Sequence, residues 1–221
     1  MRLFLFLITA IIVFDSGILS ADTDEWNVIS DKDGIVLSQK AVDLSAYRTY
    51  KADAVINMSM ETLIEVMLDV NSYTEWMPGC TGAKTVSEKK IDDPVIKDYI
   101  IHILWDAQWP VKNRDFVIET RADVDWISGR ASVVLDSIDN SRVPVSNKKF
   151  RLKKYWGKFD CQYISRNETR VSYQSMIHPG GKVGPGLSNT FTRNIPRGIM
   201  KGLRRIAAND KYKKAAIKDF Y

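Results

Sequence analysis

The chain has 221 residues, 45% of them hydrophobic, and its 32 Lys and Arg residues against 27 Asp and Glu residues give a formal net charge of +5 at pH 7. This length is enough for one sizeable domain with its own hydrophobic core. Only two His and two Cys residues are present. They do not have the spacing of a zinc site, so we expect neither a bound metal nor another cofactor.

The first 21 residues have the pattern of a secretory signal peptide. Arg2 provides a positive charge, residues 3–14 are mostly apolar, and Leu19-Ser20-Ala21 offers small residues for cleavage. The alternative is an uncleaved membrane anchor, but a spanning helix needs about 20 apolar residues, and Asp15 ends this run earlier. We therefore expect export to the periplasm or the medium, and one mature domain over residues 22–221.

Export would place the two cysteines in an oxidising compartment. Cys80 and Cys161 could then form a disulfide. Cys161 also lies close to Phe159 and Tyr163, where a packed free thiol is the alternative. Their spacing permits a bridge without requiring one.

The first part of the mature domain combines strands with one helix. Residues 34–38 predict a short strand, and residues 46–56, which alternate apolar with polar side chains, predict a longer one. Ser59 is an expected N-cap, with Thr62 three positions later. The helix that follows has one apolar stripe, made of Leu63, Val66, Met67 and Val70. It is expected to end in the loop at residues 73–79.

A series of strands is predicted next. They are expected around Val86 and over residues 95–105, 115–125, 130–138, 148–156, 158–165 and 169–178. Turn residues separate several of them, for instance Ser128-Gly129 and Arg166-Asn167-Glu168. Consecutive strands joined by short turns indicate one antiparallel, meandering sheet.

The last predicted element is an amphipathic helix that begins near Leu187, after the glycine-rich residues 180–186. Its apolar stripe recurs every fourth residue, at Leu187, Phe191, Ile195, Ile199 and Leu203. Pro196 predicts a kink or a restart within it. One sheet and one late helix pack economically if the sheet curls around the helix. We therefore predict an α+β fold in which a curved antiparallel sheet wraps around a long C-terminal helix.

The C-terminal part is strongly basic. From Arg193 to Tyr221 there are nine Lys or Arg residues, against Asp210 and Asp219. Arg193, Arg197, Lys201 and Arg204 are expected to lie away from the apolar stripe. Such a face could contact anionic lipid head groups, although a solvated helix face is the more common explanation of a charge cluster. Nucleic acid is not expected, because the basic residues are not interleaved with aromatic ones.

One central segment resembles a known family. Residues 109–117, with the sequence WPVKNRDFV, resemble the PWPV.NRDFV segment of START (StAR-related lipid-transfer) domains, with Gln108 before the tryptophan. Three weaker similarities follow the order of that family. They are Gly34-Ile35-Val36 after Trp26, Asp69 with Tyr73 and Trp76, and His178-Pro179-Gly180-Gly181, with His178 where the family usually has Asp.

This resemblance implies a helix-grip fold with a hydrophobic tunnel that holds a sterol, a phospholipid, a ceramide or a similar molecule. Arg114 matches the arginine that points into the tunnel of sterol-binding members. Its acidic partner falls at Ile101, so the family's ion pair is missing. A ligand head group, Asp98, Asp106 or ordered water could satisfy Arg114 instead, and so could other groups of the protein.

We expect the ligand-binding wall to come from three elements. The expected residues are Tyr99, Ile101, Ile103 and Trp105 on one strand, Arg114, Phe116 and Ile118 on the next, Trp109 at the tunnel mouth, and Leu187, Phe191, Ile195 and Ile199 on the helix. Strand alternation places Arg114, Phe116 and Ile118 on one face.

The predicted function is therefore non-enzymatic binding of one lipid or sterol-like molecule, and its transfer by a monomer that touches anionic membranes transiently. The alternative is a cyclase-like or hydrolase-like enzyme that uses the same cavity. No Ser-His-Asp or Cys-His arrangement follows from the spacing of His102 and His178, so the sequence favours the carrier.

Overall fold

The computed structural model describes residues 25–42, 45–89, 98–107 and 112–213. The predicted signal peptide and Trp109 lie outside these residues. The strands are β1 (Asn27–Lys32), β2 (Ile35–Val42), β3 (Ser45–Ile56), β4 (Cys80–Lys89), β5 (Asp98–Trp105), β6 (Arg114–Asp125), β7 (Arg130–Ser137), β8 (Phe150–Arg151), β9 (Lys154–Ser165) and β10 (Glu168–His178). The helices are α1 (Met60–Leu68), the 3-10 turn η1 (Val70–Ser72), α2 (Tyr73–Trp76), α3 (Pro185–Thr192), α4 (Ile195–Ala207) and α5 (Asp210–Lys213).

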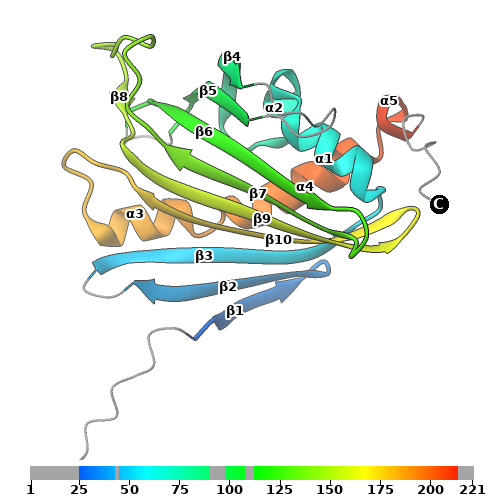
Figure 1. Ribbon diagram of the computed structural model, residues 1–221. Coiled ribbons are helices and arrows are strands. Elements are labelled where there is room, and N and C mark those ends of the chain that lie inside the picture. The colour runs from blue at the N-terminus through cyan, green and yellow to red at the C-terminus, as the bar shows by residue number, and fades with distance from the viewer. Residues whose placement is uncertain (1–24, 43–44, 90–97, 108–111, 214–221) are drawn as a thin grey trace, which may run out of the picture.

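The strands form one curved sheet in the order β1-β2-β3-β10-β9-β7-β6-β5-β4, with β8 paired to β6. Adjacent strands along this path are antiparallel, whereas the short β8 runs parallel to β6. Figure 1 shows the sheet wrapping around α3 and α4. The predicted helix-grip architecture is confirmed. None of the helices in the described ranges is long and apolar enough to cross a bilayer.

The first helix begins as its sequence signals predicted, but it ends at Leu68, so Val70 lies in η1, and residues 73–76 of the predicted loop form α2. The hydroxyl of Ser59 accepts a hydrogen bond from the backbone N–H of Thr62 at 3.2 Å, so Ser59 is the N-cap. The predicted stripe of Leu63, Val66, Met67 and Val70 is buried. Burial of this stripe holds α1 against one end of the sheet.

Two strand predictions were wrong or incomplete. Residues 27–32 form β1, for which the sequence carried no clear alternation. A strand over 148–156 does not form, because only residues 150–151 pair with β6 while β9 begins at Lys154 and continues through Gly157. Gly157 pairs with Leu135 on one side and Ser175 on the other, so hydrogen bonds to both neighbours keep it extended. A turn at Gly157 would break both ladders.

The C-terminal helix restarts at the position that Pro196 predicted. α3 ends at Thr192, and α4 begins at Ile195 with the proline in its first turn. Ile199, Met200, Leu203 and Ile206 are buried against the concave face of the sheet. Close packing also requires Gly202, because a Cβ there would lie 1.9 Å from the carbonyl oxygen of Trp76.

The prediction for Leu187 was wrong. Its side chain is 42% exposed. The buried positions of α3 are Ser188 and Thr192, and a helix rotates by about 100° per residue. Leu187 is therefore turned away from the concave face, and the two buried positions of α3 are polar.

Candidate functional site

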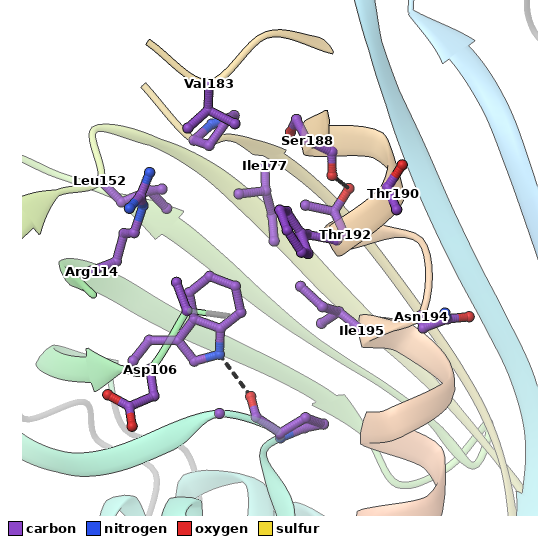
Figure 2. Close-up of a pocket in the computed structure, with 16 residues that line it drawn as sticks. Asp106, Arg114, Leu152, Ile177, Val183, Ser188, Thr190, Thr192, Asn194 and Ile195 are labelled. Carbon is purple, nitrogen blue, oxygen red and sulfur yellow. Dashed lines mark hydrogen bonds between the residues drawn. The ribbon is translucent and has the colours of Figure 1, made fainter. Parts of the chain in front are cut away.

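A cavity of about 470 Å³ lies between the sheet and the joint of α3 and α4 (Figure 2). It is lined by Pro78, Gly79, Trp105, Asp106, Ala107, Arg114, Leu152, Ile177, Pro179, Val183, Ser188, Thr190, Phe191, Thr192, Asn194 and Ile195. A smaller hollow of about 40 Å³, here the inner hollow, continues it between the sheet and α4 and shares Trp105, Leu152, Ile177 and Ile195 with it. The volume lies in the range of sites for one small ligand.

The inner hollow is aromatic and apolar apart from two hydroxyls. Phe116, Tyr155, Tyr173 and Ile199 line it. The hydroxyl oxygens of Tyr155 and Tyr173 are 3.0 Å apart and hydrogen-bonded. Burial raises the pKa of both phenols, so both stay protonated at neutral pH. Gly157 makes room for this pair, because a Cβ there would lie 2.5 Å from the Tyr155 oxygen.

Among the described residues that line the cavity, Arg114 is the one with a cationic side chain. It is 3% exposed, and burial lowers its pKa without removing its charge. One Nη donates to the backbone carbonyl of Lys112, and the guanidinium lies 5.4 Å from the centre of the Phe150 ring. It forms no ion pair with a carboxylate of the described residues, and a buried cation without a counter-charge is costly.

The strand register changes the expected surroundings of Arg114. It lies opposite Trp105 on β5, whereas Ile101 lies opposite Ile118. The position beside the arginine is therefore occupied by Trp105 rather than by Ile101. Asp106 lines the cavity mouth, but its carboxylate accepts a hydrogen bond from the Asn113 amide.

The α3 wall of the cavity carries three hydroxyl side chains, Ser188, Thr190 and Thr192, beside Phe191. Ser188 is 2% exposed, and its Oγ has no hydrogen-bond partner among the described residues. Thr192 donates its hydroxyl to the backbone carbonyl of Ser188 at 3.0 Å. Figure 2 shows Arg114 and Ser188 on opposite sides of the cavity. A polar ligand group near the mouth would thus meet a cation on one wall and a free hydroxyl on the other.

The predicted ligand-binding residues divide into three groups. Trp105, Arg114, Phe116, Phe191, Ile195 and Ile199 line the cavity or the inner hollow. Ile101, Ile103 and Ile118 are buried in the core, and Tyr99 packs against it, but none of these four lines either space. Leu187 is exposed, and Trp109 is not among the described residues.

Sequence reasoning missed several lining residues. Tyr173 and Ile177 alternate along the strand predicted at 169–178, so strand periodicity could have found them. Leu152 lies between the short β8 and β9, outside any regular pattern. Ser188 is a small polar residue, and only the packing of α3 shows that it faces the cavity.

The residue after Arg114 belongs to a separate buried cluster. Asp115 Oδ2 accepts hydrogen bonds from Arg151 Nη2 at 2.7 Å and His102 Nε2 at 2.9 Å. Burial raises the pKa of Asp115, but these two partners outweigh it and hold the pKa below its usual value. Arg151 also donates to the carbonyls of Val143 and Pro144, which ties the loop before β8 to β6.

The described residues give little support for a metal site or a disulfide. They contain no group of three or more His, Cys, Asp or Glu side chains placed to hold a metal ion. Cys80 and Cys161 are buried free thiols, so the disulfide that their spacing permits does not form in this structure. Burial raises the pKa of both, that of Cys161 to about 12.

Comparisons with known proteins agree with this geometry. The START domain model matches residues 19–213. An uncharacterized protein of Pseudomonas aeruginosa is 25% identical over 189 residues, covering 85% of this chain and 89% of that protein. The crystal structure of a STAR-related lipid transfer protein from Xanthomonas axonopodis matches with a TM-score of 0.74 and 23% identity, covering 84% of this chain and 100% of that one.

A similar fold also occurs in an enzyme. The ZhuI aromatase/cyclase from Streptomyces sp. R1128 matches with a TM-score of 0.52 and 11% identity over 72% of this chain and 93% of that one. At this identity the likeness shows the fold alone. The family match spans most of this sequence and includes the segment around Arg114. The chain belongs to the START domain family.

Proposed function

We propose that this protein binds one amphipathic lipid in the cavity and carries it without chemical change. The observation that carries the proposal is the polarity of the cavity. Its inner end is closed by Phe116, Ile199 and the two tyrosines. Its mouth holds Arg114, which forms no ion pair with a described carboxylate, and the hydroxyl of Ser188, which has no hydrogen-bond partner among the described residues. A ligand with an apolar body and a polar or anionic end complements both parts.

Hydrophobic burial supplies enough free energy for such binding. Burying about 400 Å² of lipid surface at about 25 cal/mol per Å² corresponds to roughly 10 kcal/mol. Association and ordering remove part of this gain. The remaining free energy is consistent with a dissociation constant of about 1 μM or lower. A charge-assisted hydrogen bond to Arg114 would select ligands with an anionic or carbonyl oxygen at the polar end.

The N-terminal sequence supports export, and we propose that the mature monomer moves lipid across an aqueous compartment. Membrane contact would depend on basic side chains that stay exposed, such as Arg193. Arg204 contributes less, because its guanidinium donates to the backbone carbonyls of Asp33, Gly34 and Val55. The ammonium of Lys201 lies 3.5 Å from the carboxylate of Asp33.

The direct test is mass spectrometry of the purified protein under native conditions, followed by extraction of its lipid. We expect a mass increase of one lipid per chain and the same lipid in the extract. A protein that is empty as purified, and that takes up none of a panel of sterols, fatty acids and phospholipids, would refute lipid carriage.

The second candidate is an enzyme on the same cavity, which the cyclase fold match favours. The two histidines argue against it. His102 is hydrogen-bonded to Asp115 outside the cavity lining, and the His178 ring lies 4.2 Å from that of Tyr47 and accepts from Gly180 N–H. The Tyr155–Tyr173 pair is the remaining acid–base candidate in the cavity. If bound lipid is chemically altered on incubation, and the Tyr173→Phe variant does not alter it, the enzyme hypothesis prevails.

A further inference from the structure

A second hollow, here the polar groove, lies on the other side of the joint between α3 and α4. Its volume is about 710 Å³, and its lining residues come from β1, β2, β3 and the two helices. Thr190 and Asn194 line both the polar groove and the cavity. Figure 1 shows α3 beside β3, the strand that carries Tyr50. The helix joint thus separates an apolar space from a polar one.

The polar groove carries an excess of positive charge. Lys32, Arg193 and Arg197 line it, and Asp31 is the acidic residue among its described lining residues. Neither arginine forms an ion pair with a described carboxylate, and the same holds for Lys32. Arg193 follows the last residue of α3, and Arg197 lies in the first turn of α4. The positive end of the α4 dipole adds to the charge there.

Two polar groups of the polar groove lack a hydrogen-bond partner among the described residues. Tyr50 is only 3% exposed, and its hydroxyl makes no hydrogen bond to the described residues. The Nε–H of Arg197 is buried and unpaired, while its Nη2 makes one long bond of 3.5 Å to the Ile35 carbonyl. Burial raises the pKa of Tyr50, and the charges of Arg48 and Arg193 offset part of the rise, so both arginines act on the tyrosine. Leaving a buried donor such as the Nε–H of Arg197 without an acceptor is costly.

We propose that the polar groove binds a phosphate group. A guanidinium matches phosphate oxygens in geometry and charge, and the Tyr50 hydroxyl can donate to a third oxygen. A free phosphate compound and a phospholipid head group share this chemistry. The site is distinct from the cavity and does not depend on lipid carriage, although bound phosphate would contact the joint that also lines the cavity.

The test compares calorimetric titrations of the full mature chain with inorganic phosphate and with glycerol 3-phosphate. The site variant is Arg193→Gln/Arg197→Gln. The control is Arg142→Gln/Lys148→Gln, which removes the same charge from two exposed residues before β8. We expect saturable binding in the parent and the control, and about tenfold weaker binding in the site variant, since each charged hydrogen bond contributes appreciably.

Tyr50→Phe separates a ligand contact from a structural one. Its hydroxyl has no partner among the described residues, so the thermal midpoint should be unchanged while phosphate binding weakens by about fivefold. Flotation with phosphatidylcholine vesicles, with and without phosphatidic acid, distinguishes the sources. If soluble phosphate binds, a free phosphate compound is sufficient as the ligand. If soluble phosphate does not bind, but the site variant reduces flotation with phosphatidic acid vesicles, the ligand is a lipid head group. If the site variant behaves like the control in both assays, the polar groove does not bind phosphate.

Discussion

Arg151 donates two hydrogen bonds to the same carboxylate oxygen of Asp115, from Nη2 at 2.7 Å and from Nε at 3.1 Å. Adjacent residues of a strand point to opposite faces of the sheet, so Asp115 lies in this cluster while Arg114 lies in the cavity. The ion pair also joins β6 to the β8 segment, which carries Phe150, and the Phe150 ring packs against the Arg114 guanidinium. The Asp115 carboxylate therefore helps to position Arg114 from the opposite face of the sheet.

Replacing Asp115 by Asn should destabilise the fold strongly. Both members of the Asp115–Arg151 pair are almost fully buried, and removing one charge leaves the other uncompensated. The expected loss is about 3–5 kcal/mol in the free energy of unfolding. Asp136→Asn is the control, because its partner Arg121 is 52% exposed, and exposed pairs contribute about 0–1 kcal/mol. Urea unfolding measures both, and equal losses would contradict the assignment.

Acid should remove part of the stability that Asp115 contributes. Its pKa in the folded protein is lower than its ordinary value of 3.8. A carboxyl with a depressed pKa contributes its full stability above the unfolded pKa and loses it as the pH falls through the folded pKa. The free energy of unfolding should therefore decrease once the pH is below about 3.9. It is measured at a series of pH values from neutral to acid. The decline should be shallower in Asp115→Asn, and parallel curves would show that Asp115 is not responsible.

Arg114→Leu should weaken binding of ligands with a charged polar end more than it affects folding. A fatty acid and its methyl ester have the same tail but differ in head-group charge. The parent should prefer the acid by about tenfold, because a hydrogen bond to a charged group contributes roughly 1.5–3 kcal/mol, and the variant should lose this preference. Competition against a fluorescent fatty acid measures it. An unchanged preference would place the polar end of the ligand elsewhere.

Ile195→Trp should block lipid binding by filling the space where the cavity meets the inner hollow. The matched control is Leu187→Trp, which adds the same side chain to an exposed position on α3 outside the cavity lining. We expect lipid affinity to be at least about tenfold weaker in the first variant, corresponding to about 1.4 kcal/mol, and unchanged in the second. Similar uptake by both would mean that lipid binds outside this cavity.

The two cysteines should resist alkylation in the folded protein. Cys80 and Cys161 are buried, and burial raises the pKa of both thiols, so little thiolate forms at neutral pH. Iodoacetamide should modify neither residue of the native chain and both after unfolding in urea, as counted by mass spectrometry. If both cysteines stay unmodified after unfolding in urea without reductant, the chain instead contains a disulfide.

Local sequence patterns were sufficient for several elements. Ser59 and the stripe from Leu63 to Val70 identified α1, because capping and helical periodicity depend on residues three or four apart. Pro196 identified the restart of α4 for a similar reason, since its missing N–H acts within one helical turn. The segment around Arg114 indicated the family before any contact was known.

Other features depended on pairing between distant segments. The local sequence predicted a break between two strands at Gly157, whereas in the structure β7 and β10 pair with it on both sides. The register that sets Arg114 opposite Trp105 depends on the whole β5–β6 pairing, and one residue of slip would turn every side chain to the other face. The helical pattern predicted that Arg204 is solvated, whereas its guanidinium donates hydrogen bonds to the backbone carbonyls of Asp33 and Gly34.

By itself, the sequence determined most of the strands and the start of α1 and α4, because periodicity and capping are local properties of the chain. Its resemblance to the family indicated Arg114, which lines the cavity. Only the tertiary structure decided which residues line the cavity, and that Leu187 faces solvent while Ser188 faces inward. It also brought Tyr50, Arg193 and Arg197 together in the polar groove. These contacts join residues far apart in the sequence, and their distances are set by the curvature of the sheet and the angle of the helix joint.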